Sequence, residues 1–414
     1  MPLLTLKAQI HAAPEVEALL KEAMRSATKV YNGLLWHLRE AYQKTGRVDL
    51  SRKNLNRILK KLPRAKDYYS MSVQLTREEV REAYQSFFAL KKQGKTRHQA
   101  PGFRRKEYLS PLKYVQSGFK IASLTKVEGD RVTVSLGTGR KDGARQVSFR
   151  IAHRPGVRYE RVRQLSIVYD KFSGRLEARL TVEVEAAPRP GEGRVALDLG
   201  ETILMAAVFD DGSAYLYSGR GLKAVRRYWQ KVRANLKRGS RRWREVAHRE
   251  KLQVDHLLRQ AALHFLRECA KRGVGEVVVG DLSGLREGLD YGEVLNQRLH
   301  AWPYRKLVET LRYKGALMGI AVREVEERQT SVTCHACGKA LPSNRRHRGF
   351  YACSCGWRAQ ADVNGALNIY QRAFQVSPVK GSSGRVARPV VRSFRLGWHG
   401  VHEPKRGGDS SRAS

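Results

Sequence analysis

Four of the five cysteines in this 414-residue chain lie close together, in two pairs with the spacing of a metal site. The first pair is C-x-x-C and the second is C-x-C, and a glycine follows each pair. Structural zinc is usually held by four such ligands in a tetrahedron, which leaves no open position for catalysis. We therefore predict one structural Zn²⁺ bound by Cys334, Cys337, Cys353 and Cys355.

The second pair is one residue shorter than the usual C-x-x-C, so alternatives stay open. His335 or His347 could replace one sulfur, and the cysteines could also be buried without a metal. Cys269 lies in an apolar helical run and is predicted to be an ordinary core residue. This use of cysteine favours a reducing, intracellular compartment over a disulfide framework.

Three acids stand at, or just beyond, the ends of predicted strands. Asp198 lies in the run 194–200, Glu327 ends the run 319–327, and Asp362 follows the second cysteine pair. A two-metal phosphodiesterase needs acids that converge from different elements on two cations about 4 Å apart. Magnesium prefers oxygen ligands and phosphate. One such acid is weak support, but the three in this order predict a site for two catalytic Mg²⁺ ions.

The second half of the chain has the pattern of an α/β core that could bring these acids together. Its apolar runs predict, in order, strands at 194–200, 206–209 and 214–217, a helical region at 220–270, a strand at 276–282, a helix at 304–318 and a strand at 319–327. The first three strands form a meander. The later order of strand, helix and strand, at 276–282, 304–318 and 319–327, implies a parallel crossover.

The first half has a different pattern. It predicts a strand at 3–10, helices between 14 and 92, a loop at 91–106 and short strands between 113 and 188. A Pro- and Gly-rich linker, 188–193, marks a domain boundary. The tail from about 377 is basic and rich in Gly and Ser, so it is predicted to be disordered.

Charge points to a polyanionic partner. The chain has 79 Lys and Arg against 39 Asp and Glu, a net charge of +40, and such an excess suits binding to nucleic acid through released counterions. The alternative is a ribosome-associated or merely basic protein, and each basic segment could be only a solvated loop or helix face. The candidate contacts, from the loop and the Arg-rich helical region, are Arg104, Arg105, Lys106, Arg226, Arg227, Lys231, Arg238, Arg241 and Arg242.

Other classes are excluded by what the sequence lacks. No run of about 18 apolar residues predicts a membrane span, and the N-terminus does not have the pattern of a secretory signal. We expect a cytoplasmic, nucleoid-associated protein of a prokaryotic cell that has no membrane partner.

Three segments carry a family resemblance. Residues 194–200 (RVALDLG), 330–338 (TSVTCHACG) and 361–369 (ADVNGALNI) resemble the signature blocks of TnpB proteins, with softer similarity at 101–106 and 116–121. TnpB proteins are transposon-encoded, RNA-guided nucleases of the OrfB type, ancestral to type V CRISPR effectors. The resemblance covers about residues 1 to 373.

The resemblance implies a multidomain α/β fold with an RNase H-like (RuvC) core. It implies Asp198 as the first catalytic acid and Asp362 as the last, a guide RNA called ωRNA, and double-stranded target DNA with a short flanking motif. The implied parts are a wedge-like β-barrel at 1–12 and 95–190, a helical recognition insert at 13–94, the RuvC-like domain at 191–329 and 358–375, a zinc ribbon at 330–357 and a basic tail at 376–414.

The chain departs from the family at the middle acid. A glutamate usually stands directly before Asp-Leu on the 276–282 strand, and here that position is Gly280. Asp281 could replace it, although a shift of one residue along a strand turns the side chain to the other face. Glu327, at the end of the neighbouring parallel strand, is the preferred replacement. A third reading is that the site is inactive.

Three functions follow. The leading hypothesis is an RNA-guided, Mg²⁺-dependent DNA endonuclease, in which the guide reads the sequence and the protein binds backbone. A catalytically inactive RNA-guided repressor is the alternative that Gly280 suggests, although Asp198 and Asp362 argue against it. A strand-transferring transposase is the third, and the ribbon before the last acid disfavours it.

Overall fold

Two separate units, Met1–Glu185 and Ala186–Ser414, make up the chain in this computed structural model. The structure describes residues 2–94, 99–122, 130–140, 142–153, 160–282, 302–347, 349–377, 389–393, 395–397 and 400–402. Their boundary along the chain, after Glu185, lies close to the linker predicted at 188–193. The finer division into five parts that the resemblance implied stays a prediction.

An antiparallel sheet of seven strands forms the base of the first unit. Its order is β2-β6-β7-β1-β5-β4-β3. The two edge strands are consecutive in the chain through the short turn η2 (Gln116–Gly118), so the sheet is nearly closed, as expected for the predicted barrel. The strands are β1 (Leu3–His11), β2 (Leu112–Val115), β3 (Phe119–Ala122), β4 (Asp130–Ser135), β5 (Gln146–His153), β6 (Arg161–Asp170) and β7 (Arg175–Glu183).

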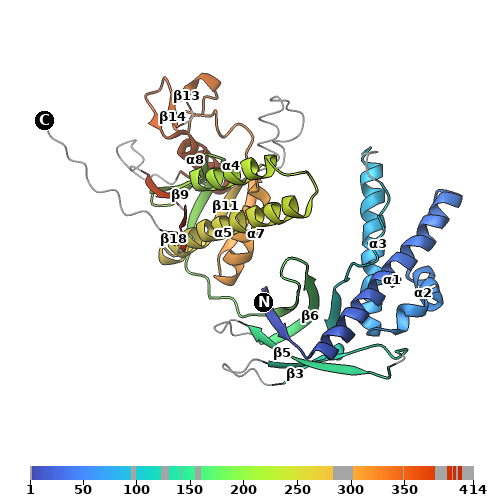
Figure 1. Cartoon of the computed structure of the whole chain (residues 1–414). Helices are drawn as coiled ribbons and strands as arrows, with labels where there is room; N and C mark the ends of the chain where they lie inside the picture. The colour runs from blue at the N-terminus through green and yellow to red at the C-terminus, as the bar shows by residue number, and fades with distance from the viewer. Residues whose placement is uncertain are drawn as a thin grey trace. The chain divides into compact units, whose positions relative to one another are not determined.

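Helices are inserted between β1 and β2 (Figure 1). They are α1 (Pro14–Thr45), α2 (Arg52–Lys61), the turn η1 (Pro63–Lys66) and α3 (Ser70–Lys92). α1 begins with Pro14, whose fixed φ suits a first turn, and ends at Gly46, whose φ of 66° closes the helix on Tyr42. Leu20, Met24, Ala27 and Leu34 follow the helical period and are fully buried, which fixes α1 on its neighbours.

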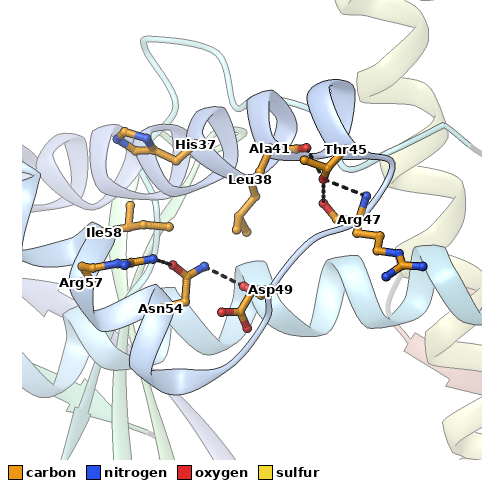
Figure 2. Close-up of a pocket in the computed structure, with 9 residues that line it drawn as sticks. All are labelled: His37, Leu38, Ala41, Thr45, Arg47, Asp49, Asn54, Arg57 and Ile58. Atoms are coloured by element: carbon orange, nitrogen blue, oxygen red, sulfur yellow. Dashed lines mark hydrogen bonds between the residues drawn. The ribbon is translucent and has the colours of Figure 1, made fainter.

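A cavity of about 420 Å³ lies between α1 and α2 (Figure 2). Its wall includes Arg57, which donates to the side chain of Asn54, and Asn54 in turn donates to the carbonyl of Asp49. The polar groups of this wall thus bond one another and tie the 47–51 loop to α2. None of the predicted catalytic acids lines this cavity.

The second unit is built on a mixed sheet of six strands in the order β12-β11-β8-β9-β10-β16. β8, β9 and β10 form an antiparallel meander, and β11 and β12 continue the sheet in parallel beside β8. The predicted meander and crossover are confirmed. The strands are β8 (Gly193–Asp198), β9 (Ile203–Phe209), β10 (Ala214–Ser218), β11 (Val274–Asp281), β12 (Ala321–Glu326) and β16 (Val390–Ser393).

Helices cover both faces of this sheet (Figure 1). On one face α4 (Arg220–Ala234), α5 (Arg241–Lys271) and α7 (Tyr304–Leu317) pack on alternate strand residues such as Leu197, Val277 and Val279. On the other face α8 (Ala361–Phe374) packs on the intervening residues, including Ala196 and Val278. This alternation decides which face each acid at a strand end can reach.

A small ribbon precedes α8. It consists of the turn η4 (Pro342–Asn344) and three short strands, β13 (Arg345–His347), β14 (Phe350–Ala352) and β15 (Arg358–Ala359). Two or three residues per strand bury little apolar area, so such a ribbon needs additional support such as a metal ion.

The prediction that the tail from 377 is wholly disordered is wrong for two short segments. β16 pairs in parallel with β10, with Tyr215 beside Val390 and Leu216 beside Val391. The other is a hairpin of β17 (Arg395–Gly397) and β18 (Gly400–His402). Two consecutive β-branched valines next to an available sheet edge explain β16, which composition alone did not reveal. In the described part of the chain, no helix is long and apolar enough to cross a membrane.

Candidate active site and metal-binding ribbon

Asp198 and Gly280 lie side by side at the ends of two parallel strands. β8 and β11 pair with Leu197 opposite Val279, so Asp198 is beside Gly280. Val278 packs towards α8, and position 280, two residues later, faces the same side. Asp198 follows the same alternation from Ala196. The missing middle acid would therefore have stood next to Asp198 on the α8 face.

Glu327 fills the space above Gly280. The residue directly follows β12, which ends at Glu326. A Cβ atom added at Gly280 would lie 2.2 Å from Oε2 of Glu327 and 2.9 Å from Cδ1 of Ile369. No side chain fits at position 280 while Glu327 is in this place. The carboxylate of Glu327 thus lies where the first side-chain atom of a residue at position 280 would stand, beside Asp198.

A second glycine makes room for Asp198. A Cβ atom at Gly365 of α8 would lie 2.3 Å from Oδ2 of Asp198. Asp362, three residues earlier on the same helix, is close enough to Asp198 to affect its pKa. The structure therefore brings Asp198, Glu327 and Asp362 together from β8, the end of β12 and the first turn of α8.

The carboxyl groups are held where their negative charges are poorly tolerated. Burial raises the pKa of Asp198 well above its usual value, and the neighbouring Glu327 and Asp362 raise it further. Burial, and then the charge of Asp281, raises the pKa of Glu327 to about 7. Such mutual repulsion in a buried place is typical of sites built for a cation.

Arg345 of the ribbon is a functional candidate that the sequence reasoning did not identify. Its Nη2 lies 3.2 Å from Oδ1 of Asp362, and its charge lowers the pKa of Asp198. Oδ2 of Asp362 accepts a bond of 2.8 Å from the side chain of Gln360, which also caps α8. Arg345 stands between the two cysteine pairs, where nothing in the sequence distinguishes it from the adjacent Arg346.

Asp281, the other replacement considered, points away from this group by strand alternation. Position 281 belongs to the face of Val277 and Val279, which pack with α5 and α7, and Asp281 affects the pKa of Arg305 of α7. It is still close enough to raise the pKa of Glu327. Asp281 is thus close to the cluster of Asp198, Glu327 and Asp362, but it belongs to the other face of the sheet.

The cluster of three carboxylates is suited to binding divalent cations. Oε2 of Glu327 is buried and has no hydrogen-bond partner in the described structure. Leaving a buried charged oxygen unpaired is costly, and a divalent cation offsets that cost. Three converging carboxylates are also the hard oxygen donors that Mg²⁺ prefers.

The free energy of unfolding is expected to depend on the ionisation of Glu327. Because the pKa of Glu327 is raised in the folded protein, the folded state binds more protons than the unfolded state between about pH 4.3 and about 7. The free energy of unfolding should therefore fall as pH rises through this window. Glu327→Gln should reduce this fall in Mg²⁺-free, zinc-loaded protein, and Mg²⁺ should raise the wild-type Tm more at pH 8 than at pH 5. Calorimetry measures both; identical pH slopes for the two proteins would contradict the assignment.

The four predicted cysteines come together. Their sulfur atoms lie within 4.8 Å of one another, with Cys334 and Cys355 at 3.7 Å and Cys337 and Cys353 also at 3.7 Å. The cluster could hold a zinc ion. A hydrogen bond from the backbone at Cys355 lowers the pKa of Cys353 to about 6, which favours the thiolate that metals bind.

The two histidine alternatives are not part of the sulfur cluster. The ring of His335 lies 5.7 Å from that of Trp357 and bonds to Ser377, while His347 lies on β13 with its ring 5.6 Å from that of Phe350. Cys269, near the end of α5, is buried in the core, as predicted.

The nine predicted nucleic-acid contacts divide into two groups. Arg104 has partners within the protein: its guanidinium bonds Glu79 and lies 3.7 Å from the ring centre of Tyr31, so it holds the 101–108 loop onto the helices. Arg226 pairs with the buried Glu250 at 3.8 Å and helps join α4 to α5. The other seven are exposed: Arg105, Lys106, Arg227, Lys231, Arg238, Arg241 and Arg242.

The aromatic residues of this region also divide into buried and exposed ones. Trp229 is buried and donates to Gln253, and Trp243 is partly buried with Arg233 over its ring. Tyr228 is instead the exposed aromatic residue of α4, with 60% of its surface accessible. The sequence showed the aromatic residues but not which one faced outward.

Comparison with known proteins agrees with this architecture. A family model described as "Probable transposase" (OrfB_IS605) matches residues 178–286, and one described as "Cas12f1-like, TNB domain" matches 304–369. The TnpB-like protein ORF457 of Acidianus two-tailed virus is 24% identical over 404 residues, covering 87% of this chain and 84% of that protein. The CRISPR-associated endodeoxyribonuclease Cas12f1 of Sulfoacidibacillus thermotolerans is 32% identical over 100 residues, 24% of this chain and 22% of that protein.

Solved structures show the same fold at low sequence identity. The cryo-EM structure of a Cas12f1–sgRNA–target DNA complex matches with a TM-score of 0.61 at 15% identity, over 89% of this chain and 98% of that chain. The mini-RNA-guided endonuclease Cas_phi3 gives a TM-score of 0.51 at 11% identity, over 92% and 93%. The fold is thus that of the Cas12 effectors. The two family models and the relatives support a protein of the TnpB and Cas12f1 kind.

Proposed function

We propose that this protein is an RNA-guided DNA endonuclease whose RuvC-like site uses Asp198, Glu327 and Asp362 to hold two Mg²⁺ ions. The observation that carries the proposal is the place of Glu327, whose carboxylate occupies the space above Gly280 beside Asp198. The general kind of function is that named for the relatives, an endodeoxyribonuclease and a TnpB-like protein.

The residues of the site have separate tasks. When bound, the Mg²⁺ ions activate water and stabilise the leaving oxygen of the phosphodiester. Asp198 supplies carboxylate oxygens from the end of β8, and Glu327 does so from the position directly after β12. Asp362 supplies its own from the first turn of α8, where the helix terminus tolerates negative charge. Arg345 contacts Asp362 and is placed to bind the scissile phosphate.

Guide RNA and double-stranded target DNA are the proposed partners. The structurally similar Cas12f1 was solved with an sgRNA and target DNA. In this chain, the exposed cations of α4 and its following turn, with Tyr228 among them, form a surface suited to backbone and base contacts. A guide that reads the target by base pairing leaves the protein to bind backbone and a short flanking motif, which suits its net charge of +40. The cysteine cluster is proposed to bind one structural Zn²⁺.

Reprogrammed plasmid cleavage tests the proposal. The protein is co-expressed with its flanking transposon-end RNA, directed to one target beside a randomised motif, and assayed with and without Mg²⁺. Guide-dependent breaks that require Mg²⁺ and an enriched flanking motif are expected, and Asp198→Ala should lower the cleavage rate by about 1,000-fold or more without loss of target binding. Guide-dependent binding without breaks would instead support the repressor. The convergence of three partly buried carboxylates favours the nuclease, because a site under no catalytic constraint has no reason to keep their repulsion.

A further inference from the structure

Glu327 lies in a part of the chain that the sheet itself does not hold. β12 is the edge strand of the sheet and ends at Glu326, so Glu327 lies beyond its last ladder pair, which joins Glu326 to Asp281. A metal-binding carboxylate must be held within a fraction of an ångström to work. Some other part of the molecule must therefore fix its backbone.

Arg372 of α8 bonds the chain on both sides of Glu327. Its Nη1 donates to the carbonyl of Glu326 at 2.8 Å, and its Nη2 donates to the carbonyl of Arg328 at 3.0 Å. A planar guanidinium that spans two carbonyls fixes both their separation and their direction. The peptide units 326–327 and 328–329, on either side of Glu327, are thus held by one side chain.

The turn that follows is also held from α8. Thr330 donates to the carbonyl of Glu327 through its backbone N–H at 3.1 Å and its hydroxyl at 2.9 Å. Asn368 donates to the carbonyls of Thr330 and Thr333, each at 2.8 Å. Gln329, between them, has a φ of 64°, a conformation that needs such support.

α8 therefore connects every part of the carboxylate group. It carries Asp362 in its first turn, Gly365 against Asp198, Ile369 beside Gly280, and Asn368 and Arg372 on the Glu327 turn. An acid that has moved to a neighbouring strand can replace the usual one only if its backbone is fixed relative to the other two.

We propose that Arg372, aided by Asn368, is a positioning residue that fixes Glu327 in its metal-binding place. This inference rests on the proposed function, because it assumes that Glu327 is a metal ligand. Arg372 is itself exposed, so its two hydrogen bonds are not required to satisfy a buried charge, and removing it leaves no unpaired group in the core.

Arg323 offers a matched control. It lies on β12, the strand that leads to Glu327. Its Nη2 donates to the carbonyl of Ala373 on α8 at 3.3 Å, and its Nε bonds Glu276 of β11 at 2.5 Å. It is exposed like Arg372, but it holds the part of β12 distant from Glu327. Arg323→Met should therefore reproduce any loss of stability or charge without disturbing the carboxylate.

Manganese binding to the zinc-loaded protein without nucleic acid gives a readout that does not depend on activity. Titration followed by the EPR signal of free Mn²⁺ should show about tenfold or greater weakening in Arg372→Met, as loss of a residue behind a metal ligand typically does. Arg323→Met should bind as the wild type does. The single-turnover cleavage rate at saturating target should fall about 10- to 100-fold in Arg372→Met alone, with unchanged guide and target affinity and partial recovery in Arg372→Lys.

Other outcomes separate the possible failures. If Glu327→Gln leaves Mn²⁺ binding and cleavage intact, the assignment of Glu327 in the proposed function fails. If Glu327→Gln abolishes both but Arg372→Met behaves like Arg323→Met, only the positioning role of Arg372 is overturned. Full rescue by Arg372→Lys together with lost target affinity in Arg372→Met would also overturn it, because Arg372 would then be a phosphate contact.

Discussion

Moving the carboxylate from position 327 back to position 280 is expected to restore cleavage that either single change removes. Glu327→Ala should lower the cleavage rate by about 1,000-fold, or about 4 kcal/mol of transition-state stabilisation, because the substitution removes a metal ligand and its negative charge. Gly280→Glu should also be severely impaired, since its Cβ would lie 2.2 Å from Oε2 of Glu327. In the double variant, Gly280→Glu with Glu327→Ala, the side chain of Glu327 no longer obstructs position 280, and the new glutamate stands next to Asp198.

The recovery should be partial. Cδ1 of Ile369 lies 2.9 Å from the Cβ position at 280 and must move as well. We expect the double variant to cleave at least tenfold faster than either single variant. The same pair with glutamine at 280 is the matched control, because it has the shape of glutamate without the charge, and it should stay inactive.

The alternative in which Asp281 replaces the middle acid predicts the opposite pattern of cleavage activities. If Asp281 is the middle acid, Asp281→Ala would abolish cleavage, Glu327→Ala would not, and the double variant would gain nothing from a glutamate at 280. We expect Asp281→Ala to retain cleavage within about tenfold of the wild type, because strand alternation places this residue on the other face of β11. Steady-state and single-turnover rates on one guide-matched plasmid distinguish the two patterns.

Local pattern was enough to predict the elements that carry the acids. The meander, the crossover and the helical insert all follow from runs of apolar residues with a clear period, such as Val277 to Val279 in β11 and Leu20 to Leu34 in α1. The choice of Glu327 over Asp281 used the same rule, since one step along a strand changes the face. The space above Gly280, however, depends on the side chain of Ile369 from α8, and no local pattern contains it.

Residues that act through distant partners could not be predicted. Arg345 and Arg372 look like any other arginine in a chain with this charge, and their partners lie 17 and more than 40 residues away. The structural partners of Arg104 could not be predicted either, because Glu79 of α3 and Tyr31 of α1 neutralise and cover it from distant parts of the sequence. In a strongly basic protein the type of residue says little, and the partner decides between structural and binding roles.

Removing the metal from the cysteine cluster is expected to abolish cleavage even though no cysteine belongs to the carboxylate group. Asn364, fully buried on α8, accepts from the backbone N–H of His335 at 3.2 Å and the indole of Trp357 at 3.1 Å, and donates to the carbonyl of Thr333 at 2.8 Å. It stands two residues after Asp362. The ribbon and the helix that carries Asp362 are therefore joined through one buried amide.

Cys353→Ser should lower the zinc content and unfold the ribbon, because three strands of two or three residues cannot stand alone. Arg345 would then leave Asp362, and Asn364 would lose its partners. We expect cleavage to fall by more than about 100-fold, measured with zinc content and guide-RNA affinity on the same preparation. Cys269→Ala, a buried cysteine outside the cluster, should keep both zinc and cleavage. A zinc-free Cys353→Ser protein that still cleaves at the wild-type rate would show that the ribbon does not support the carboxylate group, and the arrangement of Asp362 would then depend on α8 and the sheet alone.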